Sequence, residues 1–195
     1  MVEAIILLAC STNFCLVIIM GKAEEGAVAK AEWIVEKYHG DFKNVEEIRR
    51  KGAKPFEVLK AEKNILLREG IQAIWQLVAG VSGVTPFNAS NARIGVGDGT
   101  AAASRDQTGL QGTNKYWKLV DSAPVIEEDT SVSPSTYRIV FTATFGGDEA
   151  NFAWNEMTVV NASNDNGQNL NRLVQSFGTK ASGQSWVATC RIRLT

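Results

Sequence analysis

The chain has 195 residues, of which 45% are hydrophobic and 21% charged, with 20 Lys and Arg against 21 Asp and Glu. This composition is typical of one folded globular domain with at most a small second one, and it excludes an intrinsically disordered chain. The formal net charge of -1 argues against nucleic acid as a partner, because such proteins need a basic face to displace the counterions of phosphates.

The first twenty residues are mostly apolar, and three interpretations compete for them. A secretory signal is disfavoured because Glu3 lies where a signal carries Lys or Arg, and polar residues 11–13 interrupt the apolar run. The same interruption disfavours a transmembrane helix, which needs about 20 predominantly apolar residues, so we expect no membrane partner. We favour the third interpretation, in which Met20 is the natural start and the first nineteen residues are an upstream extension; the apolar N-terminal extension as a whole spans residues 1–21.

Residues 22–63 are dense in charge of both signs, and we interpret them as a charged N-terminal arm. The segment from Lys22 to Gly70 holds 11 Lys and Arg and 10 Asp and Glu. Alternating apolar residues predict a strand over residues 29–38, although a helical spacing fits nearly as well. A short helix ending at Gly52 and an extended stretch over residues 54–60 complete this region.

A helix is predicted over residues 65–79, with Asn64 as its N-cap and Gly80 after its end. Its apolar residues form one stripe at helical spacing. We expect this stripe to face the core; its members are Ile65, Leu67, Ile71, Ile74, Trp75 and Val78.

From residue 91 onward the apolar residues alternate with polar ones, and turn residues separate the runs. Strands are expected at residues 92–96, 116–120, 137–145, 151–160, 170–177 and 185–194. The predicted fold class is therefore mainly β (α+β). We expect an antiparallel β-sandwich or barrel over residues 64–195, with one packed helix at its N-terminal side.

The segment Gly95-Val-Gly-Asp-Gly99 has the glycine spacing of a phosphate-binding loop. Such a loop needs a following helix, whereas strands are predicted here, and a P-loop ending is absent. We therefore interpret Gly95, Gly97 and Gly99 as structural turn glycines with positive φ.

The residues give no expectation of a catalytic site, a metal site or a cofactor. Three cysteines, Cys10, Cys15 and Cys190, match neither a zinc site nor a disulfide framework, and we expect Cys190 to be a buried strand residue. The single histidine, His39, lacks partners at metal spacing. Glu156 lies in an apolar strand, so it either points outward or is paired, but one acid does not make a general acid/base pair.

Aromatic residues on the predicted strands belong mostly to the core, but tryptophan is enriched at subunit interfaces. The candidate interface residues are Trp33, Tyr38, Trp117 and Trp154.

The body of the chain, about residues 54–195, resembles the N-terminal domain of tailed-phage tail-collar and tail-fibre proteins and related small phage virion proteins. Six pieces carry the resemblance in the same order. They are Asn-Ile-Leu-Leu-Arg-Glu-Gly-Ile at 64–71, Ile-Gly-Val-Gly-Asp-Gly-Thr at 94–100, Gln-Thr-Gly-Leu at 107–110, Phe-Thr-Ala-Thr-Phe at 141–145, Glu-Ala-Asn-Phe-Ala-Trp-Asn-Glu-Met at 149–157 and Asn-Leu-Asn-Arg at 169–172.

The resemblance implies a non-enzymatic virion protein that self-associates, as a trimer or ring, and docks on other virion proteins at the tail, baseplate or fibre attachment. Fibre proteins of this kind continue into a shaft and a receptor-binding tip, whereas this chain ends at Thr195, so we do not expect a direct receptor role. The alternatives are a capsid decoration protein on the head surface and a glycan-binding surface module.

Overall fold

The computed structural model describes residues 10–11, 14–15, 29–62 and 64–194. In chain order its elements are β1 Cys10–Ser11, β2 Phe14–Cys15, β3 Ala29–His39, α1 Val45–Lys51, β4 Glu57–Ala61, β5 Asn64–Leu66, α2 Arg68–Val78, β6 Arg93–Gly97, β7 Lys115–Leu119, β8 Val125–Asp129, β9 Thr136–Phe145, β10 Ala153–Val160, β11 Asn171–Thr179 and β12 Gln184–Leu194. The short strands β1 and β2 pair with each other.

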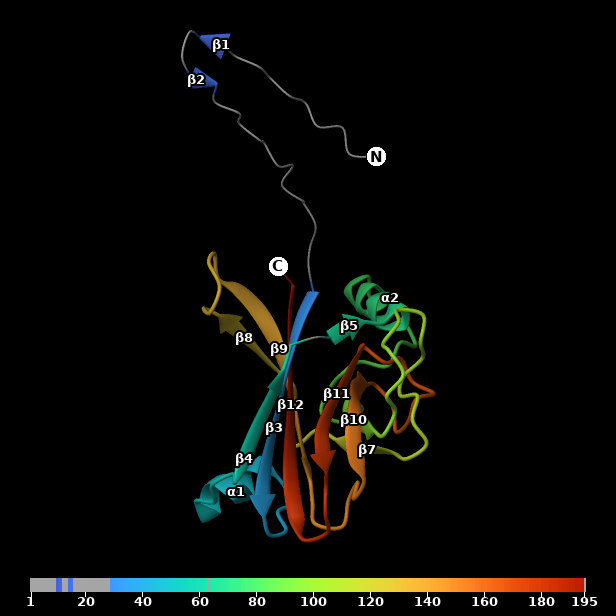
Figure 1. Ribbon diagram of the computed structural model, residues 1–195. Helices are drawn as coiled ribbons and strands as arrows, with labels where there is room; N and C mark the ends of the chain where they lie inside the picture. The colour runs from blue at the N-terminus through green and yellow to red at the C-terminus, as the bar shows by residue number, and fades with distance from the viewer. Residues whose placement is uncertain (1–9, 12–13, 16–28, 63, 195) are drawn as a thin grey trace.

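Two five-stranded antiparallel sheets pack together (Figure 1). One has the order β5-β11-β10-β6-β7 and the other the order β4-β3-β12-β9-β8. Neither sheet closes on itself, so of the two predicted architectures the sandwich is confirmed and the barrel is wrong. The strands predicted after residue 91 are all present, and β8 is an additional one. Its sequence, Val-Ile-Glu-Glu-Asp, does not alternate between apolar and polar residues and therefore gave no strand signal.

Side chains from alternate strand positions fill the space between the two sheets. On β3 the odd positions 31–35 are buried, which confirms the strand predicted there. The rings of Phe145, Trp154 and Trp186 meet edge to face, with centroids 4.6 and 4.9 Å apart. This arrangement brings the positive edge of one ring to the negative face of the next.

Helix α1 covers part of the outer face of the second sheet and closes a smaller apolar cluster. The buried members of this cluster are Tyr38, Phe42, Ile48 and Val187. The side chain of Asn44 accepts a hydrogen bond from the Glu47 N–H at 2.8 Å and caps the helix. Gly52 ends it with a φ of 64°, as the sequence predicted.

The helix predicted from residue 65 begins three residues later. Residues 64–66 form strand β5 and pair with β11, so Asn64 is not an N-cap. Leu67 stands at the N-cap position without a side-chain cap and is buried. Pairing with a distant strand overrides the helical pattern here, because Ile65 and Leu67 suit a strand as well as a helix.

Helix α2 packs on the body through its small residues and through Ile74, which lies against the core as predicted. Gly70 and Ala73 are its buried residues. A Cβ at Gly70 would overlap the backbone of Leu170, so this close approach requires glycine. The side chains of Trp75 and Val78 are 65% and 73% exposed, so the expectation that they face the core is wrong.

Residues 29–62 do not form an arm outside the sandwich. β3 lies between β4 and β12 in the second sheet and pairs with β12 along its whole length, from His39 opposite Gln184 to Ala29 opposite Leu194. The expected boundary at residue 63 therefore does not separate two structural units. Apart from residues 10–11 and 14–15, the expected extension over residues 1–21 lies outside the described residues, as do residues 22–28 of the arm.

Candidate functional site

Two charged side chains on neighbouring strands form a fully buried ion pair. Glu156 on β10 and Arg172 on β11 are both 0% exposed. The Nε and Nη2 atoms of Arg172 donate to Glu156 Oε2 at 2.8 and 2.6 Å. By strand alternation Glu156 lies on the opposite face from Met157, which is in the core between the sheets. The pair therefore lies on the outer face of the first sheet, beneath the loop over residues 98–114.

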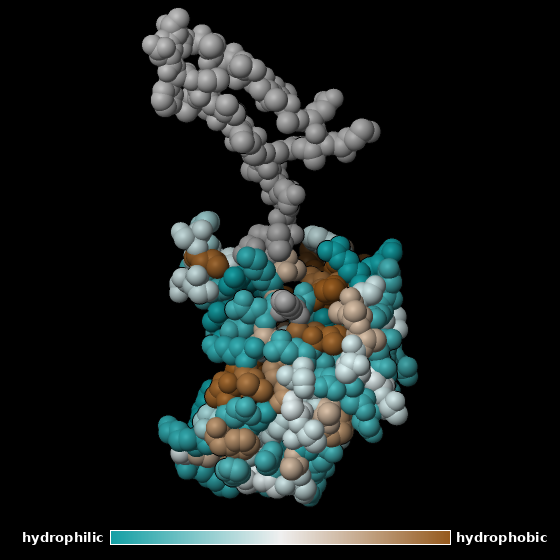
Figure 2. Space-filling view, viewed as in Figure 1, coloured by the Kyte–Doolittle hydropathy of each residue, from teal (hydrophilic) through white to brown (hydrophobic). Residues whose placement is uncertain are grey.

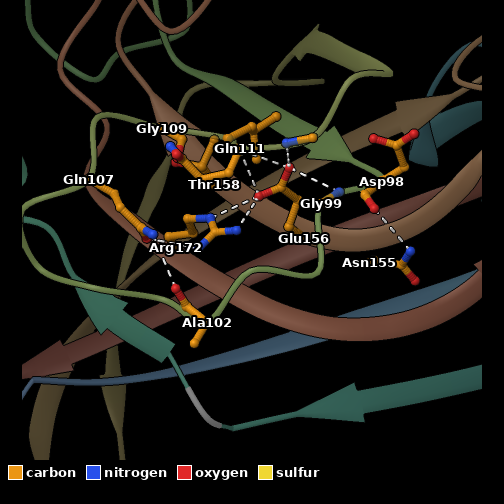
Figure 3. A network of polar contacts seen from close by, with 12 residues as sticks. Asp98, Gly99, Ala102, Gln107, Gly109, Gln111, Asn155, Glu156, Thr158 and Arg172 are labelled. Atoms are coloured by element: carbon orange, nitrogen blue, oxygen red, sulfur yellow. Dashed lines mark hydrogen bonds and ion pairs between the residues drawn. The ribbon is translucent and has the colours of Figure 1, made fainter.

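The Glu156 carboxylate also holds both ends of this loop (Figure 3). Its Oε1 accepts from the N–H groups of Gly99 at 3.2 Å, Gln111 at 3.0 Å and Gly112 at 2.6 Å. Hydrogen bonds in which one partner is ionised are shorter and stronger than neutral ones. A single carboxylate thus ties two segments of chain to the sheet.

Arg172 reaches the middle of the same loop through Gln107. Its Nη1 donates to Gln107 Oε1 at 2.8 Å, and the Ser104 N–H donates to the same oxygen at 2.8 Å. Gln107 Nε2 in turn donates to the carbonyl of Ala102 at 3.1 Å. We call Glu156, Arg172 and Gln107 the loop clamp.

Two aspartates outside the loop clamp close the loop further. Asp98 Oδ1 accepts from the N–H groups of Thr113 and Asn114 at 2.8 and 3.0 Å. The pKa of Asp98 is lower than its ordinary value, mainly because the Asn114 side chain donates a hydrogen bond to its carboxylate. Asp165 accepts from the N–H of Leu110 at 3.2 Å, so the loop end is also tied to the turn after β10.

The glycines predicted to form a turn have a different role. Gly95 and Gly97 lie within β6, and none of the three, Gly99 included, has the positive φ that was expected. A Cβ on Gly97 would lie 2.6 Å from Glu156 Oε1, and one on Gly99 would overlap the same oxygen. These two glycines leave room for the Glu156 carboxylate, which accepts a hydrogen bond from the Gly99 N–H.

The candidate interface aromatics do not come together at one surface. Trp33 and Trp154 are 0% exposed, and Tyr38 is buried in the cluster under α1. These three are packing residues, so their proposed interface role is wrong. Trp117 is half-buried, and its Nε1 donates to Asp165 Oδ1 at 3.3 Å, so it lies beside the loop.

The sequence identified half of the ion pair. Glu156 was expected to point outward or to be paired, and it is paired, but its partner Arg172 lies 16 residues away on the next strand. Nothing local in the sequence marks that partner.

The remaining candidate groups are accounted for by packing. Cys190 is buried, as expected, and burial raises the pKa of its thiol. His39 is exposed and its ring stacks on that of Phe56 at 4.3 Å.

Within the described ranges no cluster of three or more His, Cys, Asp or Glu is placed to hold a metal ion. Neither α1 nor α2 is long and apolar enough to cross a membrane.

A second polar cluster lies on the outer face of the other sheet, beside a hollow of about 500 Å³. Asp129 is 1% exposed and accepts from Ser131 Oγ at 2.5 Å and from Arg193 Nη1 at 2.8 Å. These hydrogen bonds hold the pKa of Asp129 well below its usual range. Arg191 and Arg138 are paired with Glu32 and Glu127, so the charges in this cluster are balanced.

Comparisons of the chain with protein-family models, with curated proteins and with solved structures found no match.

Proposed function

We propose that this chain is a non-enzymatic structural protein of a tailed-phage particle, which self-associates and docks on other virion proteins at the tail, baseplate or fibre attachment. The observation that carries the proposal is that four pieces of the phage resemblance, far apart in the sequence, meet at the loop clamp. Gly97 and Gly99 come from the piece at 94–100, Gln107 from the piece at 107–110, Glu156 from the piece at 149–157 and Arg172 from the piece at 169–172.

The chemistry of the loop clamp fits a structural role better than a catalytic one. The carboxylate and the guanidinium are fully buried and hydrogen-bonded to each other and to the loop. A charged pair in this state positions backbone and does not meet a substrate. A fixed loop on a rigid sandwich is suited to repeated, identical contacts in a symmetric particle.

A deletion of the coding sequence from the phage genome tests the proposal. We expect particles that lack tails or fibres under the electron microscope, and restoration of normal morphology when the wild-type chain is supplied from a plasmid. In a parallel experiment the plasmid supplies the Glu156→Gln variant, which should restore normal morphology in fewer particles than the wild-type chain does. Particles of normal shape and infectivity without the chain would overturn the proposal.

A further inference from the structure

The four most exposed large apolar side chains among the described residues lie at one end of the sandwich. This end carries α2, the β8–β9 hairpin and the end of β12, and it lies opposite to α1 (Figure 1). In the space-filling view apolar surface is visible there on both sides, near α2 and on the hairpin (Figure 2). Monomeric proteins seldom leave large apolar side chains grouped in this way, and such groups mark interaction surfaces.

The first of these surfaces lies on α2, and we define it as Arg68, Trp75 and Val78. Trp75 and Val78 are three residues apart, and Arg68 precedes Trp75 by two helical turns, so all three share the solvent side of the helix. The indole of Trp75 is 65% exposed and Val78 is 73% exposed. The Arg68 side chain is 77% exposed; its ion pair with Asp106 is equally exposed and contributes little.

The second surface lies on the hairpin, and we define it as Ile126, Glu128 and Tyr137. Glu128 is directly opposite Tyr137 in the β8–β9 pair, and Ile126 is two residues from Glu128 on the same face. Ile126 and Tyr137 are 71% and 67% exposed. They lie on the inner face of the second sheet, which packs on the core further along strand β9 but is uncovered at the hairpin. The carboxylate of Glu128 is at the surface and accepts only from Ser135 Oγ at 2.7 Å within the described residues.

We propose that the α2 surface of one copy packs against the hairpin surface of a second copy, with Arg68 facing Glu128. Each surface offers two large apolar side chains, whose joint burial would stabilise the contact. Arg68 on the first surface and Glu128 on the second are exposed groups of opposite charge, and their pairing would fix the orientation of the contact. This inference rests on the proposed function and specifies the contact through which the chain self-associates.

The two surfaces are different, so the contact is heterologous. Such a contact repeats from copy to copy and produces a ring when the rotation closes. Because both surfaces lie at the same end of the sandwich, the contact would bring that end of each copy together around the ring.

Charge exchange in the full chain tests this contact by analytical ultracentrifugation over a range of concentrations. Arg68→Glu and Glu128→Arg each place like charges in contact, and we expect each to weaken association at least about tenfold. The double variant restores the pair in reverse and should recover most of the lost association. Val58→Ala changes an apolar residue that is 47% exposed on β4, away from both surfaces, and should leave association unchanged.

A wild-type chain that stays monomeric at high concentration would overturn the inference. So would association that neither charge variant weakens, or that the double variant does not recover, because the contact would then lie elsewhere on the chain. The proposed function is tested separately by particle morphology. A monomeric chain whose deletion still removes tails would therefore overturn this inference and the self-association in the proposed function, but not the role in the particle.

Discussion

The side chain of Glu156 is 0% exposed, and its carboxylate accepts hydrogen bonds from one guanidinium and three backbone N–H groups. Such a group is stable only as part of a complete network, because an unpaired buried charge is very costly. The network explains why Gly97 and Gly99 lie beside it, and why Gln107 and Arg172 are needed as well. The loss of any one of these residues would leave a buried polar or charged group of the network without a partner, or without room.

Glu156→Gln keeps the shape of the side chain but leaves the Arg172 charge buried without a counter-ion. We expect a loss of about 3–5 kcal/mol in the free energy of unfolding, measured by urea denaturation. Glu127→Gln is the matched control, since Glu127 pairs with Arg138 at 2.7 Å but its side chain is 41% exposed. Its loss should stay below about 1 kcal/mol, and equal losses in the two variants would show that burial is not what makes the first pair important.

Lys180 gives the fold a pH dependence on the alkaline side. Its side chain is buried, and Nζ donates to the Gly146 carbonyl at 2.7 Å and to Asn151 Oδ1 at 2.8 Å. Burial lowers its pKa from 10.5 to about 8, so between these values the unfolded chain holds the proton more firmly than the folded one. Stability from this group is therefore lowest below pH 8 and rises from pH 8 to 10.5.

Lys180→Met removes this titration and leaves the other groups in place. The free energy of unfolding of the wild type minus that of the variant should rise by up to about 3 kcal/mol between pH 8 and 10.5. Thermal or urea unfolding of both proteins across this range measures the difference. A difference that stays flat or falls would contradict the lowered pKa.

At the scale of elements, the strands were predictable and the start of α2 was not. Alternation along β3 and β12 reflects a two-sided sheet, so the pattern within each strand is enough to identify it. Residues 64–66 suit either state and become a strand because β11 is available for pairing. The loop clamp depends on contacts between distant segments, which no local pattern records.

Strand β6 should not accept a side chain at Gly97, because the new Cβ would lie 2.6 Å from the fixed Glu156 carboxylate. Gly97→Ala should lower the free energy of unfolding by about 1–3 kcal/mol in urea. Gly147→Ala is the control, since its Cβ would meet Asp41 at an ordinary 3.4 Å and its φ is not positive. We expect less than about 1 kcal/mol there; a similar loss at both sites would argue against the carboxylate as the cause.

Helix α2 should tolerate the loss of its largest side chain. Trp75→Ala removes a residue that is 65% exposed, so the free energy of unfolding of the monomer should change by less than about 1 kcal/mol. Trp33→Ala empties a fully buried site and should cost about 3–5 kcal/mol. Thermal unfolding of dilute protein compares the two, and a large loss for Trp75→Ala would place this side chain in the core after all.

At the scale of the whole molecule, a rigid sandwich presents a fixed loop on one sheet and two exposed apolar surfaces at one end. Both features suit a protein that acts through repeated contacts with itself and with neighbours. A glycan-binding module would instead bind polysaccharide without any other virion protein, which a binding assay on the purified chain distinguishes. A capsid decoration protein would share the fold but differ in its copy number.

Quantitative mass spectrometry of gradient-purified particles shows whether the chain is a component of the particle, as proposed above. We expect peptides of this chain in every particle fraction, at a constant ratio to the major capsid protein that corresponds to a few copies at the tail. A ratio near one would place the chain on the head instead. Particles without these peptides would contradict the account.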